Sequence, residues 1–137
     1  MSGSIMLDSN VWIYAFMKGD DKRIIDATQL VEESENIILT TQIINEVCHV
    51  LLRKYRATDK SIVNYIDYFY EEYPVVVIGE ETIRLASTLR IDKQFSFWDS
   101  LIVASALENN CTILFSEDMQ HGQMVEEKLL IQNPFQL

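Results

Sequence analysis

Four acidic residues have the types and positions expected of a metal-dependent hydrolytic site; we call them the acidic quartet: Asp8, Glu46, Asp99 and Asp118. The set contains no Lys or His, so its members would repel one another unless a divalent cation offsets their charge. Hard oxygen ligands favour Mg²⁺ or Mn²⁺. A site of this kind suits hydrolysis of phosphodiester bonds, because the metal activates water and neutralises charge on the leaving oxygen.

Each of these acids also has an ordinary structural explanation. Asp8 and Asp118 could be turn or cap residues, since each follows an apolar run. Asp99 comes three residues after Ser96, which is the spacing of a capping box at a helix N-terminus. Glu46 is the hardest to explain in this way, because it falls on the apolar stripe of a predicted helix. A carboxylate there is costly unless it is paired or bound to metal.

Short apolar runs alternate with longer helical patterns along the chain. We predict strands over residues 5–7, 37–39, 75–78, 111–115 and 128–132, and helices over residues 11–17, 22–35, 42–55, 60–73, 80–93 and 97–107. This pattern is typical of a parallel sheet covered on both faces. The expected fold is therefore α/β, a three-layer α/β/α sandwich with a short parallel sheet of four or five strands. Ligands of such sheets bind beyond the carboxyl ends of the strands, where the acidic quartet can gather.

The helix predicted over residues 97–107 is apolar nearly all round, with Phe97 and Trp98 counted in its apolar surface. Such a helix belongs in the middle of a domain rather than on its surface. Its one charged residue, Asp99, lies in the first turn, at the positive end of the helix dipole. Besides the capping box, a second interpretation is that Asp99 enters a cleft at the positive end of a buried helix.

The composition predicts one ordered domain over residues 1–137, since 48% of the residues are apolar and only four are Gly. A net charge of −10 argues against simple electrostatic capture of nucleic acid or of an anionic membrane. It does not exclude a nuclease, because bound cations would offset the acids. No apolar run approaches the length of a membrane span. Cys48 and Cys111 show no metal or redox spacing, which predicts free thiols and a cytoplasmic protein.

The tightest basic cluster is Arg53, Lys54 and Arg56. Arg53 lies seven residues after Glu46, so a helix would place both on nearly the same face. One interpretation is a solvated helix end; the other is a set of phosphate contacts for the substrate beside the metals. A second set of basic residues, which follows the first acid, has the same two interpretations: Lys18, Lys22 and Arg23.

Four segments in this order resemble the PIN-domain ribonucleases and, within them, the toxin halves of bacterial VapBC-type pairs. The segments are 7–15 (LDSNVWIYA), 45–47 (NEV), 97–107 (FWDSLIVASAL) and 114–122 (LFSEDMQHG). The resemblance implies that the catalytic, metal-binding acids of the family are the acidic quartet. It also implies that Asn10 and Ser116 are the polar residues beside the first and last acids. Glu117 makes the last position ambiguous, but the family pattern places the ligand at Asp118.

The resemblance further implies a Mg²⁺- or Mn²⁺-dependent endoribonuclease, dimeric and neutralised by an antitoxin protein. The preference for RNA rests on the resemblance, because the residues themselves show no reader of the 2′-hydroxyl. Two alternatives therefore stay open at this point. One is a metal nuclease that acts on DNA, and the other is a non-catalytic interaction domain stabilised by metal.

Overall fold

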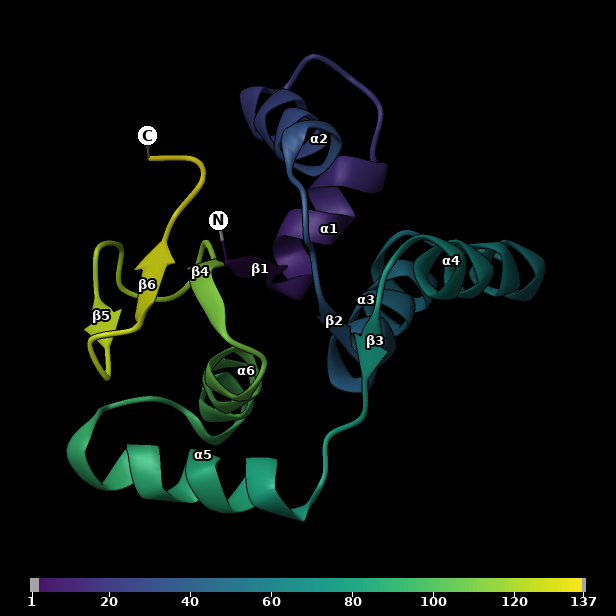
Figure 1. The fold of residues 1–137 in the computed structure, drawn as a ribbon. Helices are drawn as coiled ribbons and strands as arrows, with labels where there is room; N and C mark the ends of the chain where they lie inside the picture. The colour runs from purple at the N-terminus through teal and green to yellow at the C-terminus, as the bar shows by residue number, and fades with distance from the viewer. Residues whose placement is uncertain (1–2, 137) are drawn as a thin grey trace.

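A computed structural model describes residues 3–136 of the protein, in which helices alternate with short strands (Figure 1). The strands are β1 (Ser4–Leu7), β2 (Leu39–Thr40), β3 (Val75–Val76), β4 (Cys111–Phe115), β5 (Met124–Val125) and β6 (Leu129–Gln132). The helices are α1 (Ser9–Phe16), α2 (Lys22–Glu33), α3 (Thr41–Lys54), α4 (Asp59–Glu72), α5 (Glu80–Asp92) and α6 (Phe97–Glu108). Each predicted helix is present, with its ends within two residues of the prediction.

The main sheet has the strand order β1-β4-β6-β5 and is parallel except for β5 at its edge. β2 and β3 form a second, parallel pair. A parallel bridge between Ile5 and Ile37 connects the two sheets, and the amide of Ile38 donates to the carbonyl of Ile5 at 2.9 Å. The predicted parallel sheet is thus confirmed, and it is interrupted between β1 and β2.

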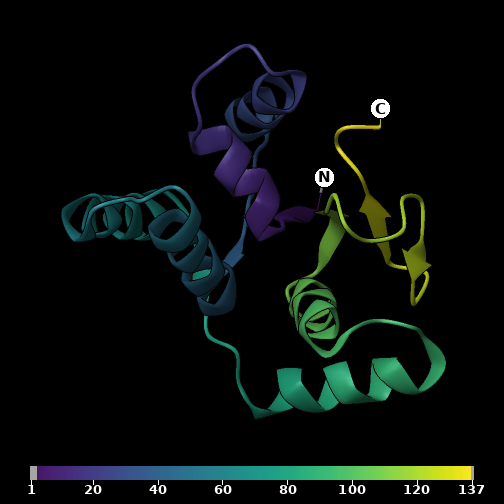
Figure 2. The ribbon, with the colours of Figure 1, turned by 180° about the vertical axis from the view of Figure 1, so that it is seen from behind.

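The helices cover both faces of the sheet, which confirms the predicted three-layer arrangement. α1 and α2 lie on one face, and α5 and α6 lie on the other (Figures 1 and 2). α3 and α4 extend to the side of β2 and β3. The core between these layers contains fully buried aliphatic side chains such as Met6, Val103, Leu114 and Ile131. This burial fixes β1 and β4, the strands that precede Asp8 and Asp118.

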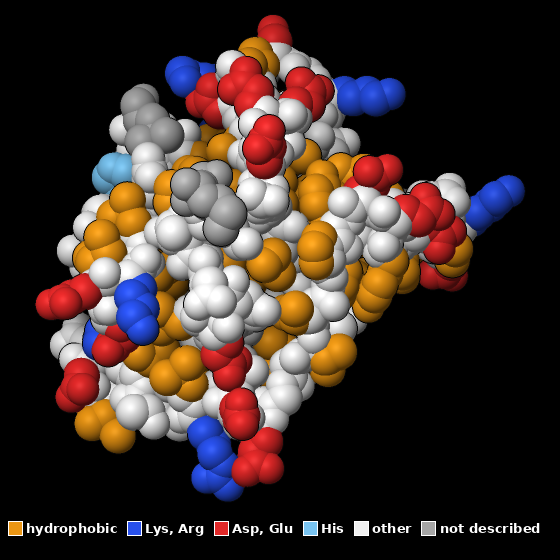
Figure 3. Space-filling model, in the orientation of Figure 1, with side chains coloured by type: hydrophobic (Ala, Val, Ile, Leu, Met, Phe, Trp, Pro, Cys, Tyr) orange, Lys and Arg blue, Asp and Glu red, His pale blue; other side chains and the backbone are white. Residues whose placement is uncertain are grey.

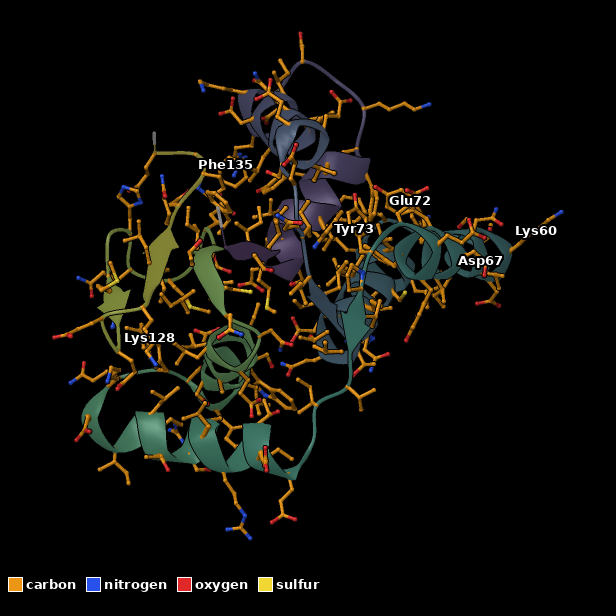
Figure 4. The ribbon with its side chains drawn as sticks, in the orientation of Figure 1. Lys60, Asp67, Glu72, Tyr73, Lys128 and Phe135 are labelled. Atoms are coloured by element: carbon orange, nitrogen blue, oxygen red, sulfur yellow. The ribbon has the colours of Figure 1, made fainter. Side chains whose placement is uncertain are left out.

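Aromatic residues fasten α4 to α1. The ring of Trp12 meets Phe69 and Tyr73 edge to face, with 5.2 Å between the ring centroids in each pair. Phe16 packs against Tyr65 with centroids 4.7 Å apart. Tyr73 directly follows α4, at the end of the helix nearest the sheet. From there α4 projects away from the sheet, with Lys60 at its far end (Figure 4). These contacts fix α1, and therefore the residues at its N-terminus, against the rest of the fold.

Three strands differ from the prediction. The strand predicted over 37–39 is β2, which begins only at Leu39, and Ile37 forms an isolated bridge to Ile5 instead. The strand predicted over 75–78 is only β3, which is half-buried, and Val77 is 77% exposed. Its partner β2 is two residues long, so Val77 has no strand to pair with. β5 was not predicted, because a two-residue antiparallel strand leaves no periodicity in the sequence.

The interior helix α6 is buried from Ser100 to Ala106, as predicted. Its first turn is different: Phe97 is 40% exposed and Trp98 is 64% exposed. The prediction that these two aromatic residues belong to the buried surface was therefore wrong. α6 enters the core only at its second turn, so its N-terminal residues lie at the surface beside Asp99.

The surface carries both acidic and apolar regions. Figure 3 shows acidic side chains around the rim of one face and hydrophobic side chains exposed between the part formed by α2 and the arm formed by α4. An open groove of about 560 Å³ lies there, lined by Phe16, Val31, Tyr65 and Tyr68 among others. None of the helices within residues 3–136 has the length and apolar composition to cross a membrane.

Candidate active site

Asp8 and Ser116 lie side by side at the carboxyl ends of β1 and β4. The amide of Asp8 donates to the carbonyl of Phe115 at 2.9 Å, which continues the strand pairing by one residue. The hydroxyl of Ser116 donates to Oδ2 of Asp8 at 3.0 Å, and the amide of Ser9 donates to Oδ1 at 2.8 Å. Asp8 is thus the N-cap of α1, as its ordinary explanation predicted, and its carboxylate is also held at the sheet edge.

Asp118 faces α1 through Asn10, whose side-chain amide donates to Oδ2 of Asp118 at 2.7 Å. The neighbouring Glu117 has other contacts. The hydroxyl of Tyr14 donates to Glu117 at 3.4 Å, and the guanidinium of Arg23 lies 3.5 Å from its second oxygen. The structure therefore brings Asp118, rather than Glu117, to the side of Asn10.

Asp99 lies in the first turn of α6, where its amide donates to the hydroxyl of Ser96 at 3.1 Å. This is one half of the predicted capping box, because the Ser96 backbone amide makes no reciprocal hydrogen bond to the Asp99 carboxylate in the described residues. The Asp99 carboxylate instead lines a polar cavity of about 490 Å³ together with Asp118. Asp99 and Asp118 therefore border the same space.

Glu46 is half-buried on α3, between the buried side chains of Ile43 and Val47. The side-chain amide of Gln42, one turn earlier, donates to Oε1 of Glu46 at 3.0 Å. Glu46 also lines a second cavity, of about 740 Å³, together with Trp98. The helix thus carries the carboxylate to the side of α6 that Trp98 and Leu101 form, whereas Asp99 lines the other cavity.

The charges of the acidic quartet influence one another. Burial raises the pKa of Asp8 to about 6, and the charges of Glu46 and Asp99 add to this effect. The hydrogen bonds from Ser9 and Ser116 oppose it. Burial also raises the pKa of Asp99, the side chain of Ser96 opposes this effect, and the charge of Asp118 raises the pKa further. The geometry agrees with these effects, because Asn10 of α1 bonds to Asp118, and Asp118 lines the same cavity as Asp99.

The arrangement is open. No three Asp, Glu, His or Cys side chains within residues 3–136 converge closely enough to form a ready metal-ion ligand set. The acids share one edge of the sheet without making a closed cage. What the geometry establishes is a half-buried acidic region at the carboxyl ends of β1 and β4.

One known protein family matches most of the chain. The sequence model of the PIN domain matches residues 5–126. The chain belongs to the PIN domain family. This confirms the family resemblance found from the sequence motifs. A search of curated protein sequences found no match.

Solved structures share the fold of this PIN domain. A toxin–antitoxin complex from Klebsiella pneumoniae has a TM-score of 0.72 at 17% identity, over 96% of this chain and 98% of that chain. FitAcB from Neisseria gonorrhoeae has a TM-score of 0.70 at 14% identity, over 97% and 99%. Mycobacterium tuberculosis VapC20, described as a sarcin-ricin loop cleaving toxin, has a TM-score of 0.68 at 17% identity, over 84% and 92%. At these identities the likeness establishes the fold alone.

The donor chemistry of this PIN domain fits a hydrated divalent cation. Mg²⁺ keeps several of its waters and uses one or two carboxylates, so it does not need a closed protein cage. Burial is the main cause of the raised pKa values of Asp8 and Asp99, and neighbouring acids raise them further. Neither acid forms an ion pair with a basic residue in the described part of the chain. A cation would relieve this repulsion. Asp8 and Asp99, with Glu46 and Asp118 beside them, are the residues that could hold it.

The basic cluster lies apart from the acids. Arg53, Lys54 and Arg56 are exposed at and beyond the end of α3, and none forms an ion pair with another described residue. Lys54 lies over the ring of Tyr55 at 5.6 Å from its centroid. Arg53 is about 10 Å along the helix axis from Glu46, given a rise of about 1.5 Å per residue. A substrate role for this cluster stays a prediction.

The second basic set is partly neutralised by neighbouring acids. Lys22 pairs with Asp26 at 2.7 Å, one helical turn away. Arg23 lies near Asp21 as well as Glu117. These pairs leave less positive charge available for a phosphate than at the end of α3.

Two residues beside the acids were missed by the sequence analysis. Gln42 positions Glu46, and the signal for it was its spacing of four residues before the acid. Trp98 stands exposed next to Asp99, but its apolar neighbours in the sequence hid this position. Both line the same cavity, between α3 and the start of α6.

Proposed function

We propose that this PIN domain is a divalent-metal-dependent endoribonuclease and the toxin of a toxin–antitoxin pair. The observation that carries the proposal is the convergence of three acids at the carboxyl edge of the sheet. Ser116 holds Asp8 there, Asn10 of the same helix bonds to Asp118, and Asp118 lines one cavity with Asp99. An uncompensated acidic region of this kind is unfavourable in the absence of cations. It is what a metal nuclease requires, because phosphodiester hydrolysis needs charge neutralisation at the reacting phosphate.

In this proposal the acidic quartet would hold Mg²⁺ or Mn²⁺, and the bound ion would supply water activation and charge neutralisation for phosphodiester hydrolysis. The other polar residues of the site position the acids. Ser9 and Ser116 fix the two oxygens of Asp8, and Asn10 fixes Asp118. Gln42 fixes Glu46. Supporting hydrogen bonds of this kind determine how well a carboxylate presents its free electron pairs to a metal.

RNA is the proposed substrate class, supported by the family resemblance and by the description of VapC20 as a sarcin-ricin loop cleaving toxin. The chain carries −10 overall, so the phosphate backbone must find local positive charge. Arg53, Lys54 and Arg56 provide it in this proposal, since they are exposed and form no ion pair with described residues.

An antitoxin protein is the proposed regulator, supported by the shared fold with the toxin–antitoxin complex from Klebsiella pneumoniae. The acidic region suits a basic segment of such a partner, which would place Arg or Lys among the carboxylates. RNA and antitoxin would then compete for one site. The protein is also proposed to be a homodimer, which sedimentation at several concentrations would test.

The deciding experiment is a cleavage assay with end-labelled single-stranded RNA and DNA of the same sequence. We expect cleavage of RNA in Mg²⁺ or Mn²⁺, no cleavage in EDTA, and no cleavage by Asp8→Asn or Asp99→Asn. Asp67→Asn is the matched control, because Asp67 is an exposed acid on the projecting helix α4 (Figure 4). Cleavage of DNA but not RNA would contradict the proposal. So would RNA cleavage by the Asp8 and Asp99 variants at the rate of wild type.

A further inference from the structure

The larger of the two cavities beside the acids has a chemistry of its own. It opens between α3 and the first turn of α6 and has a volume of about 740 Å³. Glu46 lines it from α3, and Trp98 lines it from α6, one residue before Asp99. The volume lies within the range of about 300–1,000 Å³ that is common for small-ligand sites. The cavity therefore adjoins the acidic region directly.

Its walls are apolar and aromatic. Ile78 and Leu101 supply aliphatic surface, and the indole of Trp98 is 64% exposed. The one aromatic neighbour of Trp98 in the described residues, Phe97, meets it at 79° rather than stacked on it. Exposed aromatic surface is unfavourable in water, and its flat face is a platform for a second ring.

Its rim is polar and able to form hydrogen bonds. The side chains of Asn45 and His49 are exposed at the cavity and make no hydrogen bond to another residue in the part of the chain that the structure describes. An amide offers both donors and an acceptor, which is what the edge of a nucleobase requires. Gln42 is already occupied by Glu46.

We propose that this cavity binds one unpaired nucleobase of the substrate, stacked on Trp98 and hydrogen-bonded by Asn45. The inference rests on the proposed nuclease function, and it names which form of RNA the site takes. A base in a duplex is covered on both faces, so only an unpaired base can enter. A neutral base also fits the charge of the site better than a second copy of this acidic chain would.

Tryptophan fluorescence tests this directly, because the chain has two tryptophans and Trp12 is fully buried. Short single-stranded RNA, titrated in Ca²⁺ to suppress turnover, should quench the Trp98 emission, and Trp98→Phe should remove the quenching. Trp98→Ala should lower RNA affinity about fivefold or more, the effect of losing one stacked base. Tyr70→Ala, which alters an aromatic residue on α4 that is 55% exposed, is the matched control and should bind as wild type does.

RNAs with one abasic nucleotide at successive positions identify the bound base. An abasic nucleotide at one position should lower the RNA affinity of wild type by a similar factor. The same RNA should bind Trp98→Ala no more weakly than intact RNA does, since both changes remove the same contact. Asn45→Ala should reduce the preference among bases at that position. Equal affinity of wild type and Trp98→Ala, with folding of both confirmed by thermal melting, would overturn the inference.

Two outcomes separate this inference from the proposed function. RNA cleavage with no quenching would uphold the nuclease and overturn the base site. Quenching by single-stranded RNA without cleavage of any RNA would support the base site and overturn the nuclease. A Trp98 emission that shifts with protein concentration alone, together with a dimer lost in Trp98→Ala, would assign the cavity to a second copy and overturn the inference.

Discussion

The hydroxyl of Ser116 donates to Oδ2 of Asp8 at 3.0 Å because the pairing of β1 with β4 places Leu7 opposite Phe115. The residues that follow each strand therefore meet at the sheet edge. Ser116 is fully buried, and its hydroxyl holds a carboxylate that also interacts with Glu46 and Asp99. This one hydrogen bond links the strand register to the charge state of the candidate site.

Ser116→Ala removes a hydrogen bond that lowers the pKa of Asp8, so we expect that pKa to rise further. The pH at which cleavage reaches half of its plateau should then move upward. Stability should fall by about 1 kcal/mol, the usual effect of one lost hydrogen bond. Ser105→Ala, which removes a buried hydrogen bond within α6, is the control for stability alone. An unchanged pH profile in Ser116→Ala would count against the role of this bond.

The raised pKa of Asp8 should make the stability of the metal-free protein depend on pH. Its pKa rises from an ordinary 3.8 to about 6 in the folded protein, so the protonated carboxyl favours folding. That contribution is fully present below pH 3.8 and is lost as the pH rises through about 6. Thermal melts in EDTA should show the loss for wild type. Asp8→Asn should lack it and should melt at a higher temperature than wild type at neutral pH. Parallel pH curves for the two proteins would contradict the prediction.

Much of the candidate site could be predicted from the sequence, because its acids follow apolar runs or fall on an apolar stripe. Asp8 and Asp118 were placed at the sheet edge by the strands that precede them, and Glu46 by its helical spacing. The position of Trp98 could not be predicted in this way. Periodicity shows that a helix is apolar, but it does not show which turn leaves the core, and the first turn of α6 does so. Whether β2 and β3 extend depends on pairing, which a single strand does not reveal.

Divalent cations should stabilise the fold through the same acids. At an ion concentration of about 100 times the dissociation constant, mass action adds roughly 2.7 kcal/mol. Melting curves in Mg²⁺ or Mn²⁺ should therefore shift upward for wild type and for Asp67→Asn. The shift should be much smaller in Asp8→Asn and Asp99→Asn. A shift of equal size in all of these proteins would mean that the cation binds elsewhere.

Neutralising Asp118 should lower the activity far more than neutralising Glu117. Asp118 accepts from Asn10 and borders the cavity that contains Asp99, whereas Glu117 is held by Tyr14 and Arg23. We expect Asp118→Asn to lower kcat/KM by about tenfold or more, the scale seen when a metal site is disturbed. Glu117→Gln should retain most of the activity. The reverse order of the two effects would move the last acid of the quartet to Glu117.

Arg53 should contribute to RNA affinity through charge rather than through the metal. It is exposed and has no ion-pair partner among the described residues, so its positive charge is free to attract phosphate. Arg53→Glu should weaken RNA binding and flatten its dependence on salt, because fewer counterions are released from the RNA. Binding is measured by titration in Ca²⁺ at several salt concentrations, beside a thermal-shift measurement of Mn²⁺ binding that should not change. Lys60→Glu makes the same change of charge at the outer end of α4 and should have little effect on RNA (Figure 4). If the Arg53 and Lys60 variants give the same salt series as wild type, the basic cluster is a solvated helix end, and RNA must cross another part of the surface, with Lys18, Lys22 and Arg23 as the next positions to change.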